Sequence, residues 1–581
     1  MKKFLSSILF VTLSLFLINC GGGGSGQTSN CLYSCSNTTN NQGSSFASNY
    51  TGASYNSSTA ASFASNDEFD AVIGTSGSAQ NIYEIMNVHK AYGYGLSGDG
   101  TTIHVQDSGF DPQHYEFSNH NDPGDKTITY YQTNYTGDSS SVNHGNAVAS
   151  IALGLKNDDS QLLMGVAYDA DLYYSDYDTL KSGSDYAADW SDALDGSPST
   201  TVASNHSYCI TADIETVKNY QTTNGLSDSA TIEAYLDAAT LYSTTSGVSD
   251  WIASLKSFQA NKGVIVWALG NHADDGWNTD KVHFLAALPE LDSDLQDAWI
   301  TAGTVDISGS SGSETYTKHY QHCGITADYC LVTDSYNIRT AKHYNGSASV
   351  YQNGTSGNSF SAPMISGSVA LLSEAFSSLS PKEIKARLLA TADNTFFTAD
   401  ATTTFSNGVQ HGFNYKYGHG IPDLYKALQP ITSSMLGNSI LVGNDINNSI
   451  AYDLSGSGLS LGSSFGDSLS LGLENETGVF YDALYGTFNY DFSKSANKKN
   501  IQRNTSNFEE PKQFSKVSSK SNGNVKSNFV SSINVENNEK FLDPQNGFYY
   551  SVGVDDSNII ISNKMPLEYV LGFYELDNNT I

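Results

Sequence analysis

The sequence predicts a doubly wound, mostly parallel α/β sheet with helices on both faces, followed by a β-rich C-terminal extension. Short apolar runs, typical of buried strands, alternate with longer helical stretches along the first three quarters of the chain. After Pro430 the composition changes to Gly, Ser, Leu and Asn in alternating patterns such as Ser468-Leu469-Ser470-Leu471. The length of 581 residues suffices for one large domain with flanking segments.

The predicted elements follow one another through the large domain. The strands are expected at Thr102–Gln106, Asp171–Ser175, Val202–Asn205 and Gly263–Leu269. The helices are expected at Ala147–Leu155, Thr231–Leu241 and Asp250–Ala260. A last clear helix opens at Ser380-Pro381-Lys382-Glu383, which combines a capping box with proline at the first helical position.

The N-terminus predicts export and a lipid anchor. Lys2 and Lys3 precede an apolar stretch, Phe4–Ile18, that is short for a transmembrane helix. Leu17-Ile18-Asn19-Cys20 and the four glycines after it resemble a bacterial lipobox, in which the cysteine thiol receives diacylglycerol. An ordinary signal peptide with an incidental cysteine is the alternative. We expect residues 1–19 to be a signal peptide and Cys20 to hold the protein in the cell envelope, at the outer membrane or cell surface.

The remaining boundaries follow shifts in composition. Residues 20–75 are rich in Gly, Ser and Asn and predict a flexible tether, and residues 76–432 form the large domain. Residues 433–495 predict the β-rich extension. Residues 496–581 predict a basic, disordered linker over Lys498–Lys526 and a short strand-rich tail.

Charge and cysteine content limit the partners and the compartment. Acidic residues outnumber basic ones 60 to 28, and a net charge of -32 repels phosphate backbones, so we expect no nucleic-acid partner. In an oxidising compartment, Cys31/Cys35 and Cys323/Cys330 are candidate disulfide pairs. Cys209 then stands alone, either packed as a small hydrophobic residue or paired with Cys31 or Cys35. The spacings do not match a zinc site.

Three segments carry residues suited to nucleophilic catalysis. A strand ends in Asp107-Ser108-Gly109, at the sheet edge where open α/β sheets bind ligands. His144 starts a helix of small residues, His144-Gly145-Asn146-Ala147-Val148-Ala149. Ser359, in Gly357-Asn358-Ser359-Phe360-Ser361-Ala362-Pro363, precedes an apolar helix whose N-terminus favours developing negative charge.

In the order Asp, His, Ser, these motifs resemble the subtilisin-like serine peptidases, or subtilases. In that family the nucleophile lies four residues before a proline, so Pro363 selects Ser359 over Ser356. His114 falls in the stretch that follows the aspartate, so the resemblance makes His144 the base. The resemblance covers about residues 80–430 and includes the closing segment Tyr417-Gly418-His419-Gly420.

Two further segments resemble the substrate-binding strands of the family. Ala268-Leu269-Gly270-Asn271 resembles Ala-Ala-Gly-Asn, whose Asn donates to the oxyanion, and this implies that Asn271 is catalytic. Ser207-Tyr208-Cys209 matches the other strand, which implies that Ser207, Cys209, Ala268 and Gly270 bind substrate. The stretch from Cys323 to Cys330 resembles the autotransporter branch, which includes lipoproteins.

The resemblance implies an exported, lipid-anchored serine endopeptidase that cleaves proteins or peptides through an acyl-enzyme. No cofactor is required, and calcium, common in the family, has no assignable ligands in the sequence. Asn146 and Asn358 depart from the family's threonines, and Cys209 replaces a glycine. Two alternatives stay open: the passenger of an autotransporter whose barrel lies outside the given chain, and a non-enzymatic surface lipoprotein on a peptidase scaffold.

Overall fold

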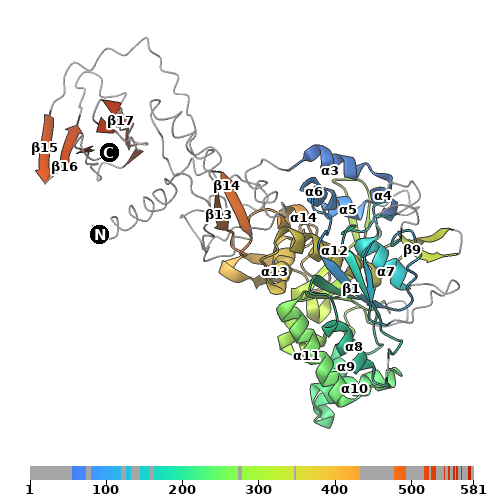
Figure 1. The fold of residues 1–581 in the computed structure, drawn as a ribbon. Coiled ribbons are helices and arrows are strands. Elements are labelled where there is room, and N and C mark those ends of the chain that lie inside the picture. Colours follow the sequence, from blue (N-terminus) through green and yellow to red (C-terminus); the bar gives the residue numbers. More distant parts are fainter. Residues whose placement is uncertain are drawn as a thin grey trace, which may run out of the picture. The chain divides into compact units, whose positions relative to one another are not determined.

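A computed structural model describes most of the chain from residue 55 to 431 and shorter pieces after it (Figure 1). The described residues are 55–73, 80–118, 126–132, 144–157, 163–181, 183–271, 278–345, 348–431, 477–491 and strand segments between 516 and 576. Within these ranges no helix combines the length and the apolar character needed to cross a membrane. Cys20, Cys31 and Cys35 lie outside the described residues.

The centre of the molecule is an eight-stranded sheet in the order β2-β3-β1-β4-β5-β6-β7, with β8 also paired to β6. All neighbouring strands are parallel except β6 and β7. The strands are β1 (Thr102–Asp107), β2 (Ile128–Tyr130), β3 (Asp171–Asp176), β4 (Thr201–His206), β5 (Val264–Ala268), β6 (Trp299–Ser308), β7 (Thr315–Lys318) and β8 (Cys330–Thr333).

Helices cover both faces of the sheet. On one face, α7 (His144–Leu153) and α12 (Asn358–Ala375) pack against β1 and β4, and Ser366 of α12 donates to Asn205 of β4. The next residue of β4, His206, points to the other face and stacks on Trp267 of β5, with ring centroids 4.2 Å apart. There α8 (Tyr186–Asp195) and α11 (Thr245–Asn261) pack together through Trp190 and Trp251. The predicted fold class is confirmed.

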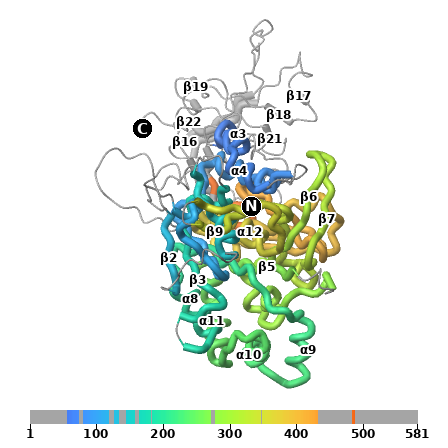
Figure 2. Tube along the Cα trace, turned by 90° about the vertical axis from the view of Figure 1, so that its right-hand side faces the viewer, coloured from blue at the N-terminus to red at the C-terminus, as the bar shows by residue number. Residues whose placement is uncertain are grey.

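The other elements surround this core (Figures 1 and 2). The further helices are α3 (Ser57–Ala64), α4 (Asp67–Asp70), α5 (Ile82–Ile85), α6 (Val88–Gly93), α9 (Ile214–Asn224), α10 (Asp228–Ala238), α13 (Pro381–Thr391) and α14 (Leu424–Ala427). Two-stranded hairpins are formed by β9 (Ile338–Tyr344) with β10 (Ser349–Thr355), β11 (Ala401–Thr404) with β12 (Gln410–Phe413), and β13 (Thr477–Tyr481) with β14 (Thr487–Asp491). The capping box predicted at Ser380 is present at the start of α13.

The order of the strands creates a switch point at β1. The chain leaves β1 for β2 and β3 on one side and then crosses to β4 on the other side. Connections that diverge in this way open a crevice at the carboxyl ends of the strands, where α/β proteins bind their ligands. Asp107, at the carboxyl end of β1, therefore lies at the expected place for a functional site.

The tether predicted over residues 20–75 is wrong in its last part. Asn56 and Asn66 cap α3 and α4, and each side chain accepts hydrogen bonds from backbone N–H groups of the first turn. Phe69 and Val72 are completely buried in the main core. Two capped helices with buried apolar residues make this segment part of the large domain.

The C-terminal boundaries also need correction. Within the predicted disordered run at 498–526, β15 (Lys516–Asn522) pairs with β16 (Val525–Ser531) as an antiparallel hairpin. The two residues between them in the sequence are Gly523-Asn524, a hairpin signal that the basic composition obscured. The described residues of the tail include the short strands β17 (Leu542–Asp543), β18 (Gly547–Tyr549), β19 (Val554–Asp555), β20 (Asn558–Ile559), β21 (Lys564–Met565) and β22 (Phe573–Leu576).

The turn of the β13–β14 hairpin packs onto the large domain through a buried ion pair. Arg387 of α13 donates from Nη2 to Asp482 Oδ2 at 2.5 Å, and both side chains are completely buried. The guanidinium also lies 4.4 Å from the ring centroid of Phe376. Part of the predicted extension 433–495 is therefore integrated into the large domain, although the intervening residues 432–476 lie outside the described part.

Candidate active site

Asp107 and His144 form a close pair at the edge of the sheet. Asp107 is completely buried, and its Oδ1 accepts hydrogen bonds from His144 Nδ1 at 2.6 Å and from the backbone N–H of Ser108 at 2.7 Å. Because Nδ1 donates to the carboxylate, the lone pair of a neutral His144 is on Nε2. Nε2 is then the atom that can accept a proton.

Two opposing effects set the pKa of His144. Burial disfavours the imidazolium and lowers the pKa, whereas the negative charge and the hydrogen bond of Asp107 raise it. The net result is a pKa above the ordinary value of 6.5. The side chain of His144 remains 32% exposed, so solvent and substrate can reach it. His144 thus has the tautomer and the access that a general base needs.

The glycine after the histidine allows the close approach of α7 to β1. A Cβ atom on Gly145 would lie 2.7 Å from the carbonyl oxygen of Gly109 and 2.9 Å from the hydroxyl of Tyr174. Tyr174 in turn donates to the carbonyl of Asp107 at 2.9 Å. A larger residue at this position would push His144 away from its carboxylate partner.

Asn146 strengthens the same junction. Its Oδ1 accepts from the backbone N–H of Asp111 at 2.6 Å, and its Nδ2 donates to the carbonyl of Asp111 at 3.4 Å. The amide therefore ties the loop after Asp107 to α7. Asn146 stands where the family has threonine, and in this chain its amide holds the loop in place.

Ser359 lies in the first turn of α12 and is 7% exposed. Its hydroxyl donates to the carbonyl oxygen of Ser207 at 3.1 Å, and no described hydrogen bond joins it to His144. The next side chain, Phe360, lies beside His144 with ring centroids 5.6 Å apart. The contact of Phe360 places the start of α12, which carries Ser359, beside His144. Catalytic hydrogen bonds are commonly long before substrate binds.

Pro363 explains the four-residue spacing that selects Ser359. Proline has no N–H, so the carbonyl of the residue four positions earlier receives no helical hydrogen bond. That carbonyl belongs to Ser359, and it accepts instead from the hydroxyl of Ser207 at 2.8 Å. Two reciprocal hydrogen bonds therefore fix Ser359 to the segment that follows β4.

Cys209 lies near the predicted oxyanion residue. It is half-buried, and the backbone N–H of Asn271 donates to it. Burial raises the pKa of the thiol to about 11, although this hydrogen bond opposes the change. A thiol with this pKa stays protonated at neutral pH, so it is poorly suited to act as a nucleophile.

The segment from Ala268 to Asn271 follows β5 and reaches the start of α12. Asn271 Oδ1 accepts from the backbone N–H of Asn358 at 2.9 Å. A Cβ atom on Gly270 would lie only 1.8 Å from the ring of His283, so a larger residue does not fit there. Ala268 is the last residue of β5 and is buried. The structure therefore brings Asn271 next to the helix that carries Ser359.

His114 and Ser356, which the family motifs exclude from the triad, have other roles. His114 is buried and its Nε2 contacts the carbonyl of Val350 at 3.1 Å, and burial lowers its pKa to about 4. The hydroxyl of Ser356 accepts from the backbone N–H of Asn337 at 2.8 Å. Both side chains hold the β9–β10 region in place.

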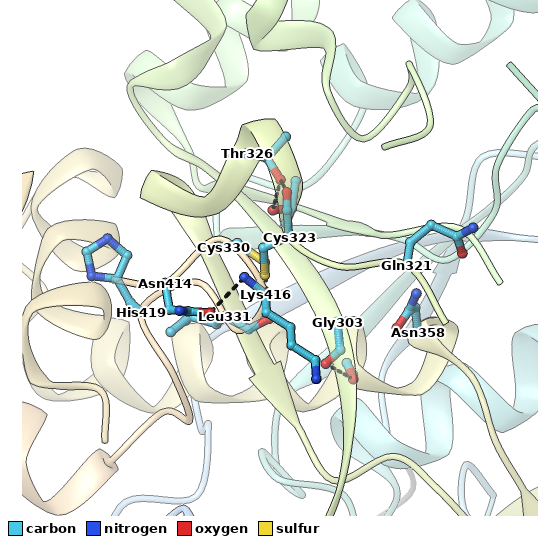
Figure 3. The surroundings of a disulfide bond; sticks show 12 residues. Gly303, Gln321, Cys323, Thr326, Cys330, Leu331, Asn358, Asn414, Lys416 and His419 are labelled. Carbon is cyan, nitrogen blue, oxygen red and sulfur yellow. Dashed lines mark hydrogen bonds between the residues drawn. A yellow bond between two sulfur atoms is a disulfide. The ribbon is translucent and has the colours of Figure 1, made fainter. Parts of the chain in front are cut away.

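Cys323 and Cys330 form a disulfide on either side of a short 3₁₀ helix, Gly324–Tyr329 (Figure 3). The carbonyl of Cys330 also accepts a hydrogen bond from the backbone N–H of His419. This hydrogen bond connects the start of β8 to the closing segment of the domain. No cluster of three or more His, Cys, Asp or Glu that could hold a metal occurs in the described ranges.

Comparison with known proteins identifies the family of the chain. A model of the subtilase family matches residues 98–420, more than half of the chain. The Neisserial autotransporter lipoprotein NalP of Neisseria meningitidis serogroup B is 29% identical over 211 residues. The match covers 34% of this chain and 17% of NalP.

Among solved structures, Sphericase is 19% identical and covers 61% of this chain and 97% of its own, with a TM-score of 0.38. Fervidolysin from Fervidobacterium pennivorans is 18% identical and covers 62% and 46%, with a TM-score of 0.37. These two likenesses are too distant to add to the assignment, which depends on the family model. The chain belongs to the subtilase family.

Proposed function

We propose that the chain is an exported, lipid-anchored serine endopeptidase whose triad is Asp107, His144 and Ser359. The observation that carries the proposal is the 2.6 Å hydrogen bond between buried Asp107 and partly exposed His144, beside the helix start that holds Ser359. An acid, a base and a hydroxyl in this arrangement are the parts of a nucleophilic acyl transfer.

The reaction follows from the position of each group. His144 Nε2 takes the proton of the Ser359 hydroxyl while the Ser359 oxygen attacks the peptide carbonyl. Asp107 stabilises the imidazolium that forms, and His144 then gives the proton to the leaving amine. Asn271 and the backbone N–H of Ser359 donate to the oxyanion, and water attacks the acyl-enzyme by the same proton transfers in a second cycle.

Substitution of two nearby serines tests the nucleophile. Ser359→Ala should abolish peptide turnover and labelling by a fluorophosphonate probe. Ser356→Ala is the matched control, because its hydroxyl contacts Asn337 and not the site, and it should keep both activities. Labelling that persists in Ser359→Ala and is lost in Ser356→Ala would refute the assignment, and no labelling of the wild type would favour a non-enzymatic scaffold.

The anchor is proposed at Cys20. The lipobox-like run before it and the similarity to NalP, an autotransporter lipoprotein, support this part. One residue that carries several acyl chains suffices for stable attachment. Cys20→Ser should therefore move the protein from the membrane fraction to the soluble fraction. Retention of the variant after a carbonate wash would show a different anchor, such as a barrel in the rest of a longer chain.

A further inference from the structure

Asn358 has a buried amide side chain that connects three elements at the active site. Its Nδ2 donates to the carbonyl of Gly270 at 2.6 Å, and its Oδ1 accepts from the backbone N–H of Thr304 at 2.6 Å. The side chain is completely buried. It therefore links the segment after β5, strand β6 and the first residue of α12.

We propose that Asn358 is a positioning residue that aims the side chain of Asn271 at the oxyanion; this inference rests on the proposed peptidase function. The backbone N–H of Asn358 donates to Asn271 Oδ1, so Asn271 Nδ2 is the atom left to donate. Gly357 gives that Nδ2 its space, since a Cβ on Gly357 would lie 3.1 Å from it.

The partners of Asn358 are themselves held in place. The hydroxyl of Ser335 contacts the Thr304 hydroxyl at 2.8 Å and donates to the carbonyl of Gly357 at 3.0 Å. The backbone N–H of Gly357 donates back to the carbonyl of Ser335 at 3.2 Å. Thr304 is therefore a fixed point, and the amide of Asn358 sets the distance from it to Gly270. Figure 3 shows Asn358 together with Gly303, the residue that precedes Thr304, in the surroundings of the disulfide.

An amide is the side chain that fits this place. Gly270 presents a carbonyl oxygen and needs a donor, whereas Thr304 presents an N–H and needs an acceptor. An aspartate would put a carboxylate oxygen against the carbonyl of Gly270. The threonine of the family pattern has one oxygen to serve both partners. Asn358 thus fixes the position of Gly270, and with it the next residue, Asn271.

The decisive experiment introduces Asn358→Asp into the wild type and into the Asn271→Ala variant. It measures kcat and KM of each protein for one peptide substrate. Asn271→Ala alone should lower kcat by about 10²–10³-fold, the loss typical of one oxyanion donor. Asn358→Asp in the wild type should lower kcat by about 10-fold with KM within about 2-fold, since the oxyanion forms only in the transition state. In the Asn271→Ala background the same change should alter kcat by less than about 2-fold, because no amide remains to be positioned.

Equal losses of kcat in both backgrounds would overturn the assignment of Asn358, and so would a rise in KM with kcat unchanged. Asn358→Thr, which has a hydroxyl in place of the amide, should give an intermediate kcat and replaces Asn358→Asp if that variant does not fold.

Gln259→Ala is the matched control, because Gln259 is a buried amide that accepts from the backbone N–H of Ala298 away from the site. It should lower the Tm without lowering kcat. Absence of Ser359 labelling in the wild type would instead overturn the proposed function.

Discussion

Asp107 and Asp482 are two buried carboxylates that each pair with a basic or cationic side chain, and they have different roles. Asp107 contacts His144 at the edge of the sheet, and Asp482 contacts Arg387 where the β13–β14 hairpin packs on α13. Both carboxylates are almost completely inaccessible to solvent. Burial and pairing alone therefore do not distinguish a catalytic carboxylate from a structural one.

The number of hydrogen bonds makes the distinction. Asp482 Oδ2 accepts from Arg387 and from the backbone N–H of Ile431, and Oδ1 accepts from two backbone N–H groups of the hairpin turn. In contrast, Asp107 Oδ2 has no hydrogen-bond partner among the described residues. The Asp482 pair is saturated and fully enclosed, whereas the Asp107 pair includes a titratable, partly exposed imidazole. Such a pair can change its protonation state during a reaction.

The same chemical change at both carboxylates should have opposite consequences. Asp107→Asn should lower kcat by about 10⁴-fold, because an amide no longer holds the tautomer of His144 or stabilises its imidazolium. Thermal unfolding should change little by comparison. Peptide hydrolysis and differential scanning fluorimetry on the same preparation would check both expectations. A kcat within about 10-fold of the wild type would remove Asp107 from the triad.

Asp482→Asn should instead lower stability and leave kcat of the folded enzyme unchanged. The buried guanidinium of Arg387 would lose its counter-charge, which typically costs about 3–5 kcal/mol. Asp294→Ala is the control, because Asp294 pairs with Lys256 but is 77% exposed, and loss of a surface pair costs at most about 1 kcal/mol. Equilibrium denaturation would measure both changes. Equal effects of the two variants would show that the hairpin does not stabilise the domain.

The same contrast shows what the sequence could reveal. Asp107, His144 and Ser359 could be named as candidates because each lies in a short local motif. The Arg387–Asp482 pair was not predictable, since the partners are 95 positions apart and Arg387 reads as an ordinary helix cation. The role of Asn358 was also missed: the sequence showed only a departure from threonine, and its partners Gly270 and Thr304 are brought together by the sheet.

Cys209 offers a smaller test at the catalytic edge. The thiol occupies the position of a family glycine and contacts the backbone N–H of Asn271, so its volume should narrow the pocket for the residue before the scissile bond. Cys209→Gly should raise kcat/KM for Phe and Tyr relative to small residues by about 1–3 kcal/mol of discrimination. Profiling with a peptide library would measure it. If the profile is unchanged, and an active-site inhibitor does not protect Cys209 from maleimide, the residue lies outside the cleft.

The smallest expected effect is a displaced pH midpoint. The net effect of Asp107 raises the pKa of His144 above 6.5, so kcat/KM should fall on acidification with a midpoint above that value. The same shift means that the pair stabilises the fold at low pH, and that this contribution is lost as pH rises through the folded-state pKa. As pH rises from about 5 to 9, kcat/KM should therefore increase while the contribution of the Asp107–His144 pair to stability decreases. The Arg387–Asp482 pair should show no such change, because arginine keeps its charge throughout this range. Measuring kcat/KM and the Tm difference between wild type and Asp107→Asn across this range tests both signs. A kcat/KM that stays constant down to about pH 4 would indicate a carboxylate base and remove the distinction between the two pairs.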